Sequence, residues 1–250
     1  MTEQLSGKEN KKGQMSLFFI LGIIIIAIVA FYLSSQKEAV KEPNQIPPDI
    51  QPVKLYLDNC LVLSSKKAFA EMGLQGGKRT LEAPFYNSTI VQTNYLYDEG
   101  VLKIDSFDFF KKNLELEIAS NLENCFLNFS EPGFTFEKGT LNITISFLEK
   151  FSQINADWKV TVIKGGGRTA LNSIEPVSLN VRLKLVYEIA ENVTNSIKNN
   201  PEKLDFVALV STGMNITIDA TNETELFLII DPESEIEQKP YGFVFAARIK

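Results

Sequence analysis

The strongest constraint on this chain is an uncharged apolar segment near its start, residues 15–33, which reads MSLFFILGIIIIAIVAFYL. As an α-helix with a rise of 1.5 Å per residue it would be about 28 Å long, close to the hydrocarbon thickness of a bilayer. A buried globular helix of this length normally has a polar face, and a cleaved secretory signal has a shorter apolar core followed by small residues. This segment has neither feature, because it ends in Phe31, Tyr32 and Leu33. We therefore expect a retained transmembrane helix.

Charged residues on the two sides of this segment predict its orientation. Three lysines precede it, whereas the two lysines that follow it are offset by two glutamates, in the order Lys8, Lys11, Lys12, Lys37, Glu38, Lys41 and Glu42. Because cytoplasmic flanks carry an excess of basic residues, we expect the N-terminus in the cytoplasm and the C-terminal part outside. The sequence thus predicts a single-pass protein of the cell membrane that contacts the lipid bilayer through residues 15–33.

Composition excludes several kinds of active site. Histidine is absent from the 250 residues, and only two cysteines are present. This excludes Ser-His-Asp and Cys-His catalysis, histidine zinc sites and four-thiolate metal sites. The net charge of −6 and the pI of about 5.0 argue against nucleic acid as a partner. No catalytic set of residues is recognisable, so we expect no enzymatic activity, no cofactor and no metal site.

The residues at the membrane boundary carry a family resemblance. Lys12-Gly13-Gln14-Met15-Ser16, followed directly by an apolar helix, is similar to the class III signal peptide of archaeal prepilin-like proteins. The resemblance implies cleavage by a prepilin peptidase between Gly13 and Gln14. One position departs from the family, because Phe18 stands where a glutamate is usual. The resemblance implies that this carboxylate pairs with a neighbouring N-terminal amine in pilin filaments, so its absence removes an electrostatic contribution to filament assembly.

A second resemblance lies further along the chain. A single span followed by Asn59-Cys60-Leu61 and then by Gly73-Leu74-Gln75-Gly76-Gly77 is similar to a set of uncharacterised archaeal membrane-anchored proteins. This resemblance implies topology and lineage, and it implies no activity.

Residues 34–52 form a predicted linker with four prolines, Pro43, Pro47, Pro48 and Pro52. Such a segment prefers extended polyproline-like geometry and interrupts any helix that would continue from the membrane. In a typical pilin, by contrast, the membrane helix continues unbroken into the globular head. The linker and Phe18 favour a membrane-anchored surface protein with a binding or structural role. The alternative is a pilin-like filament subunit processed between Gly13 and Gln14.

The predicted organisation has four parts. Residues 1–14 are a cytoplasmic tail or prepilin-like leader, residues 15–33 the transmembrane helix and residues 34–52 the linker. Residues 53–250 form an extracytoplasmic domain, either undivided or split into subdomains near 53–130 and 131–250.

Periodicity in residues 53–250 predicts an α+β domain. Apolar residues recur at helical spacing in three segments, 53–72, 110–126 and 183–197, with Ser106 as the cap of the second. Two-residue alternation or short apolar runs predict strands at 141–147, 158–162, 177–183, 214–218, 226–230 and 241–247. Alternation is typical of an antiparallel sheet with one solvated face, so we expect about three helices packed on the other face.

The two cysteines, Cys60 and Cys125, both follow an asparagine and both lie on predicted apolar helix stripes. Outside the membrane such a pair is readily oxidised, so we favour a disulfide. The alternative is two buried free thiols, which are common in protein cores.

Asn-x-Ser/Thr sequons occur more often than chance would supply, and all follow the predicted span, at Asn87, Asn128, Asn142, Asn192, Asn215 and Asn222. They are candidate glycosylation sites on an exposed outer surface. The alternative is that they reflect the asparagine- and threonine-rich solvent face of the strands.

Three further motifs have simple structural interpretations. Gly165-Gly166-Gly167 lacks the spacing of a phosphate-binding loop, so we expect a hairpin turn. The acidic residues Asp231, Glu233, Glu235 and Glu237 lack the glycine and the closing glutamate of an EF-hand loop, so we expect a solvated loop. Gln75-Gly76-Gly77 is interpreted as a helix stop and turn.

Overall fold

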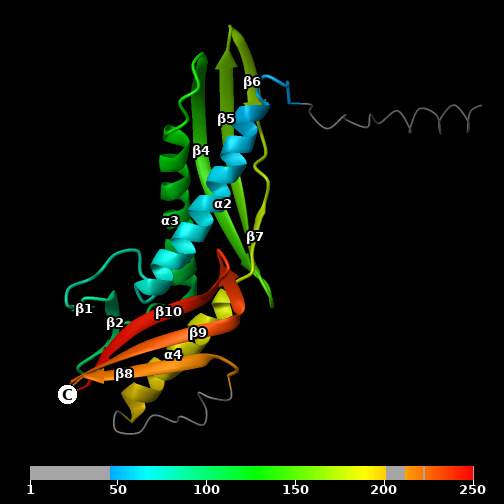
Figure 1. The fold of residues 1–250 in the computed structure, drawn as a ribbon. Helices are drawn as coiled ribbons and strands as arrows, with labels where there is room; N and C mark the ends of the chain where they lie inside the picture. Colours follow the sequence, from blue (N-terminus) through cyan, green and yellow to red (C-terminus); the bar gives the residue numbers. More distant parts are fainter. Residues whose placement is uncertain (1–45, 201–211, 222, 250) are drawn as a thin grey trace, which may run out of the picture. The chain divides into compact units, whose positions relative to one another are not determined.

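Three helices and ten strands make up the part of the chain that this computed structural model describes, residues 46–200, 212–221 and 223–249 (Figure 1). The predicted α+β class is therefore confirmed for these residues. None of the helices within these ranges is both long enough and apolar enough to cross a membrane. The predicted span, residues 15–33, lies outside the described residues.

The three helices lie where the helical periodicity places them: α2 is Gln51–Leu74, α3 is Phe107–Leu127 and α4 is Leu183–Asn199. α2 begins after a turn over residues 48–50 and carries Pro52 in its first turn, where proline has no hydrogen bond to lose. The predicted cap of α3 is confirmed, because the hydroxyl of Ser106 accepts a hydrogen bond from the Phe109 N–H at 3.3 Å.

One sheet contains four antiparallel strands, β4 (Phe134–Phe147), β5 (Ser152–Lys164), β6 (Gly167–Leu171) and β7 (Val177–Leu179). β5 pairs with β4 along one edge and with β6 and β7 along the other. Side chains alternate between buried and exposed, and the buried set packs against α2 and α3, as in the ring contact of Phe126 with Trp158 at 5.3 Å. This sheet has the predicted arrangement of helices on one face and solvent on the other.

The other sheet contains six strands in the order β1–β2–β10–β9–β8, with β3 paired to β2. Their bounds are Phe85–Asn87 (β1), Gln92–Asp98 (β2), Val101–Leu102 (β3), Asn215–Thr221 (β8), Thr224–Ile236 (β9) and Lys239–Arg248 (β10). The prediction of an antiparallel sheet is wrong at one pair, because β2 and β10 run parallel. This pairing also links the two halves of the domain, so the boundary near residue 130 does not separate the sheets.

β2 is short and buried along almost its whole length, which fits the parallel pairing. All of its residues after Gln92 are buried, with no alternation. Strands in parallel arrangements are covered on both faces, and their connections are long, so local alternation carries little information about them. α4 packs against β2, β3, β9 and β10. The strands β1, β2 and β3 were not predicted from the sequence.

The two sheets meet where the end of α2 lies against β10. A Cβ atom added to Gly73 would stand 2.7 Å from the backbone oxygen of Gly242 and 2.7 Å from the hydroxyl of Tyr241. The Tyr241 hydroxyl donates a hydrogen bond to the Phe69 carbonyl oxygen at 3.2 Å. The absence of a side chain at Gly73 therefore allows helix and strand backbones to approach each other closely.

The predicted helix stop after α2 is confirmed. Gly77 has a φ of +79°, and its N–H bonds to the Met72 carbonyl oxygen at 2.7 Å, which closes a C-terminal turn of the Schellman type. A Cβ atom at Gly77 would lie within 3.2 Å of the rings of Phe110, Tyr187 and Phe243. This turn thus occupies the centre of an aromatic cluster contributed by α3, α4 and β10.

Candidate functional site

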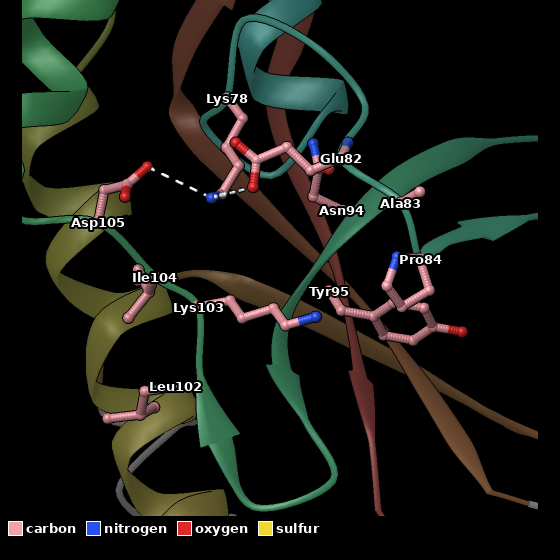
Figure 2. A pocket seen from close by; sticks show the side chains of 10 residues that line it. All are labelled: Lys78, Glu82, Ala83, Pro84, Asn94, Tyr95, Leu102, Lys103, Ile104 and Asp105. Carbon is pink, nitrogen blue, oxygen red and sulfur yellow. Dashed lines mark hydrogen bonds and ion pairs between the residues drawn. The ribbon is translucent and has the colours of Figure 1, made fainter.

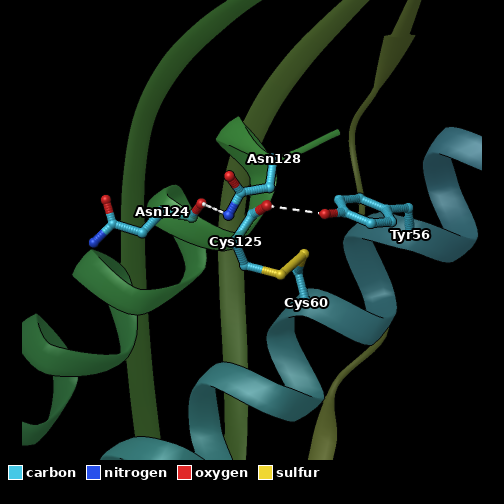
Figure 3. Close-up of a disulfide and its surroundings, with 5 residues drawn as sticks. All are labelled: Tyr56, Cys60, Asn124, Cys125 and Asn128. Carbon is cyan, nitrogen blue, oxygen red and sulfur yellow. Dashed lines mark hydrogen bonds between the residues drawn. A yellow bond between two sulfur atoms is a disulfide. The ribbon is translucent and has the colours of Figure 1, made fainter. Parts of the chain in front are cut away.

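Cys60 and Cys125 form a disulfide between α2 and α3 (Figure 3). Their Cα atoms are 5.7 Å apart, a normal separation for a disulfide, and the bond closes an interval of 65 residues. Cys60 is fully buried and Cys125 is half-buried. The Tyr56 hydroxyl donates a hydrogen bond to the Cys125 carbonyl oxygen at 3.0 Å, so a side chain of α2 also holds the end of α3. The predicted disulfide is confirmed.

The disulfide is possible because the two predicted apolar stripes face each other. Leu57 and Leu61 on α2 and Ile118 and Leu122 on α3 are completely buried. Helices whose apolar stripes pack together bring residues on those stripes to within side-chain contact distance. The pairing of the cysteines is thus a consequence of helix amphipathicity, with Cys60 in the core and Cys125 at its margin.

The predicted glycosylation candidates within the described residues are all exposed, namely Asn87, Asn128, Asn142, Asn192 and Asn215. They lie on β1, at the end of α3, on β4, on α4 and at the start of β8. Asn222 lies outside the described residues, as do Gly13 and Gln14 of the predicted processing site. The exposure agrees with an outer surface, and the modification itself stays a prediction.

A polar pocket of about 450 Å³ lies where the turn after α2 approaches β2 and the segment that leads to α3 (Figure 2). The side chains that line it include Lys78, Glu82, Asn94, Tyr95, Lys103 and Asp105. No feature of the sequence predicts this pocket. Its residues come from three separate short segments, and the strand among them, β2, gives no alternating pattern.

Lys78 is the central cation of the pocket. Lys78 is only 8% exposed, and its ammonium group lies 2.8 Å from a carboxylate oxygen of Glu82 and 3.6 Å from one of Asp105. A buried ammonium group is stable only where opposite charge compensates its lost hydration. Here two carboxylates from different segments supply that charge, and Figure 2 shows both contacts.

Asn94 fixes the loop that forms one wall of the pocket. Its side-chain nitrogen donates to the carbonyl oxygens of Gln75 and Thr80, at 2.7 and 3.1 Å, and its side-chain oxygen accepts from the Glu82 N–H at 2.7 Å. Asn94 is almost completely buried, so these bonds satisfy an amide that water does not reach. The side chain is therefore a structural support of the loop.

Lys103 joins the pocket to a second group of charges. It donates to Asp98, which also accepts from the Nε of Arg248 at 2.8 Å. Burial alone would raise the pKa of the Asp98 carboxyl, but the hydrogen bonds from Lys103 and Arg248 outweigh it and hold the pKa below its ordinary value. The Arg248 guanidinium also lies over the Tyr95 ring, 5.1 Å from its centre.

The charged side chains of the pocket are paired with one another or with a neighbour. Lys78 pairs with Glu82 and Asp105, and Lys103 pairs with Asp98. A catalytic acid, base or nucleophile needs a pKa adapted to its task and a free path to the reacting atom. Within the described residues these ion pairs give the pocket a polar wall of balanced charge, which suits hydrogen bonding and supplies no evident nucleophile.

The acidic run near the C-terminus is different from the predicted solvated loop. Asp231 and Glu233 lie within β9, and Asp231 is completely buried. Its carboxylate accepts from the Nε of Arg182 at 2.9 Å and from the hydroxyl of Ser234. The loop prediction is therefore wrong for the three residues in β9, Asp231, Glu233 and Glu235. The burial of Asp231 leaves no local signal, because its partner Arg182 is 49 residues away.

Hydrogen bonding also governs the acidity of this residue. Burial alone would raise the pKa of the Asp231 carboxyl, but hydrogen bonds from Arg182, Ser234 and the Glu233 backbone outweigh it and lower the pKa below its ordinary value. Asp231 and Arg182 therefore form a buried ion pair that joins the start of α4 to β9. No set of three or more Asp, Glu or Cys side chains in the described ranges is placed to hold a metal ion.

The glycine-rich motif is a hairpin turn, as predicted. Gly165 and Gly166 connect β5 to β6 with φ values of +55° and +84°. Nothing lies within 4 Å of the Cβ positions that these two glycines lack. The glycines thus serve the left-handed turn geometry.

No protein-family model matches this chain, and neither a curated protein nor a solved structure matches it. The function has to be argued from the residues themselves. The resemblance of Lys12-Gly13-Gln14 to prepilin-like proteins accordingly stays a prediction.

Proposed function

We propose that this chain is a membrane-anchored protein of an archaeal cell surface, held in the bilayer by residues 15–33, whose folded domain has a binding or structural role outside the cell. The observation that carries the proposal is the Cys60–Cys125 disulfide. Structural disulfides form and persist in oxidising compartments and are rare in the reducing cytosol of organisms other than hyperthermophiles. A domain whose first two helices are joined by a disulfide therefore fits a location outside the cell, which is the side of the membrane that the lysine distribution predicts.

The start of the domain supports the same proposal. Residues 46–50 form no helix, and α2 begins at Gln51 after Pro47 and Pro48. A proline-containing turn at this point supports a tether between anchor and domain. The proposal rests on the disulfide and the anchor, and not on the polar pocket, whose charged groups already have partners.

The test of this proposal is a topology experiment in intact cells. Tags at the N-terminus and after Lys250 are probed with an external protease, and free thiols are labelled in the unreduced, denatured protein. We expect degradation of the C-terminal tag alone and no thiol labelling. Protection of the C-terminal tag would place the domain inside and overturn the proposal, even if the disulfide forms after cell lysis.

The alternative function, a pilin-like filament subunit, is favoured by one observation, the motif Lys12-Gly13-Gln14-Met15-Ser16. If a prepilin peptidase recognises it, the mature protein begins at Gln14, and Gly13→Val blocks cleavage because the larger side chain crowds the scissile bond. N-terminal sequencing that finds residues 1–13 intact would reduce the motif to a basic flank of the membrane segment. Cleavage together with recovery of the chain in shed filaments would favour the filament role.

A further inference from the structure

The predicted sequons at Asn142 and Asn192 differ in one respect. In the first, the asparagine and the threonine two residues later can both be reached from one side of the molecule, and in the second they cannot. In β4, side chains two residues apart point to the same face of the sheet. Asn142 and Thr144 are both exposed, while Ile143 between them is buried on the opposite face, where the helices pack. The acceptor amide and the hydroxyl that defines the sequon are thus presented together to solvent.

The sequon on α4 has the opposite geometry. Residues two apart in an α-helix lie about 200° apart around the axis, so they point to nearly opposite sides. Asn192 is exposed, but Thr194 is completely buried, and its hydroxyl donates to the Ala190 carbonyl oxygen at 2.7 Å. An enzyme that holds the Asn192 amide cannot reach the Thr194 hydroxyl unless α4 unwinds.

The reacting atom is also more available at Asn142 than at a comparable exposed sequon. At the end of α3, the side-chain nitrogen of Asn128 donates to the Asn124 carbonyl oxygen at 3.2 Å. Asn142 makes no such side-chain bond within the described part of the chain. Its cross-strand neighbour is Asp157, which is likewise exposed. The amide nitrogen of Asn142 therefore faces solvent without a bond to break.

The surroundings of Asn142 show what a modification there would cover. The face of the four-stranded sheet that carries it is the one opposite α2 and α3, and its side chains next to Asn142 are polar. In register order the neighbouring pairs are Asn142 with Asp157, Thr144 with Asn155, and Ser146 with Gln153. β4, which carries Asn142, is an edge strand of this sheet, and an edge strand is open to pairing with other chains unless something bulky shields it.

We infer that Asn142 is an N-glycosylation site of the folded domain, and that its glycan covers the open face of the β4–β5–β6 sheet. The inference rests on the proposed extracytoplasmic location. The donor is a lipid-linked glycosyl phosphate. The Asn142 amide nitrogen forms a bond to the anomeric carbon, the bond from that carbon to the phosphate oxygen breaks, a base takes one amide proton, and the lipid phosphate leaves.

The test uses the full-length chain with a C-terminal tag, purified from membranes of cells that N-glycosylate their surface proteins. Intact-mass and glycopeptide spectra should place a glycan on the peptide that contains Asn142. Asn142→Gln and Thr144→Val should each remove the mass of one whole glycan, whereas Thr144→Ser should retain it. Asn192→Gln is the matched control and should leave the mass of the attached glycan unchanged.

The outcomes separate this inference from the proposed function. An unmodified Asn142 in a sample whose C-terminal tag is accessible outside the cell overturns the inference and leaves the proposed function intact. An inaccessible tag overturns both. A glycan on Asn192 in the folded protein would overturn the geometric argument that a helix hides one half of its sequon. The thermal midpoint of Asn142→Gln is measured as a control. We expect it to be unchanged, which would show that a lost glycan does not reflect misfolding.

Discussion

The two sheets of this domain are stabilised by different kinds of cross-link. The region formed by α2, α3 and β4–β7, here named the disulfide region, is joined by Cys60–Cys125. The region formed by α4, β1–β3 and β8–β10, here named the ion-pair region, is joined by the buried pair Arg182–Asp231 and by Asp98 with Arg248. Both regions also have aromatic cores, such as Phe126 on Trp158 and Phe227 on Phe245, so apolar packing does not distinguish them.

The kind of cross-link sets how each region fails. A disulfide acts largely by limiting the unfolded chain, so it is sensitive to reductant and insensitive to pH. A buried ion pair acts within the folded state, and its contribution depends on the charge of the carboxyl. The disulfide region should therefore respond to reductant and the ion-pair region to acid.

The largest expected effect is the loss of the disulfide. The double substitution Cys60→Ala with Cys125→Ala removes a link across 65 residues, and in the chain-entropy model this lowers the free energy of unfolding by roughly 4 kcal/mol. The measurement is equilibrium unfolding by urea. Reductant should bring the wild-type domain close to the variant, and it should leave the variant itself unchanged. A reduced wild type with unaltered stability would contradict the assigned role of the bond.

The next effect breaks the ion-pair region. Asp231→Asn keeps the size of the side chain but leaves Arg182 without its buried counter-charge, which should cost about 3 kcal/mol of unfolding free energy. Arg182 keeps Glu233 as a second partner, 3.0 Å away, which limits the loss. Exposed Glu235→Gln serves as the matched control and should change stability little.

The same substitution tests the acid response. Because the folded-state pKa of Asp231 is lowered, its contribution is fully present above the ordinary carboxyl pKa near 4 and is lost as pH falls through the lower folded value. The wild type should thus lose more stability on acidification than Asp231→Asn does. Equal pH dependence of the two proteins, measured by urea unfolding at several pH values, would show that Asp231 does not carry this response.

The disulfide region could be predicted from the sequence far better than the ion-pair region, for physical reasons. α2 and α3 are long and periodic, and their apolar stripes already placed Cys60 and Cys125 on facing surfaces. The missed features depend on distant partners. β2 pairs with β10, about 150 residues along the chain, and the buried Asp231 pairs with Arg182, 49 residues away. The pocket around Lys78 was missed for a similar reason, since Asn94 and Asp105 approach it from separate segments.

A third change acts where the two regions meet. Gly73→Ala would place a methyl group 2.7 Å from the Gly242 backbone oxygen, so helix and strand must move apart, at a cost of about 2 kcal/mol. Gly242→Ala is the matched control, because its added methyl meets only the Leu228 side chain at 3.4 Å. The readout is the thermal midpoint of both variants. Equal midpoints would mean that the close approach of α2 to β10 is not required.

The smallest effect sharpens the comparison inside the disulfide region. Ser106→Ala removes the hydroxyl that caps α3 and should lower the free energy of unfolding by about 1 kcal/mol. Ser106→Asp should restore it, because a carboxylate also accepts from the first turn and interacts favourably with the positive end of the helix dipole. Ser120→Ala, in the interior of α3, is the control and should be neutral or slightly stabilising because alanine has the higher helix propensity. The cap and the disulfide lie at opposite ends of α3, so the losses from Ser106→Ala and from the cysteine double variant should add. A combined loss well below the sum would show that the capped end of α3 frays when the disulfide is absent, and that the contribution of the cap depends on the disulfide.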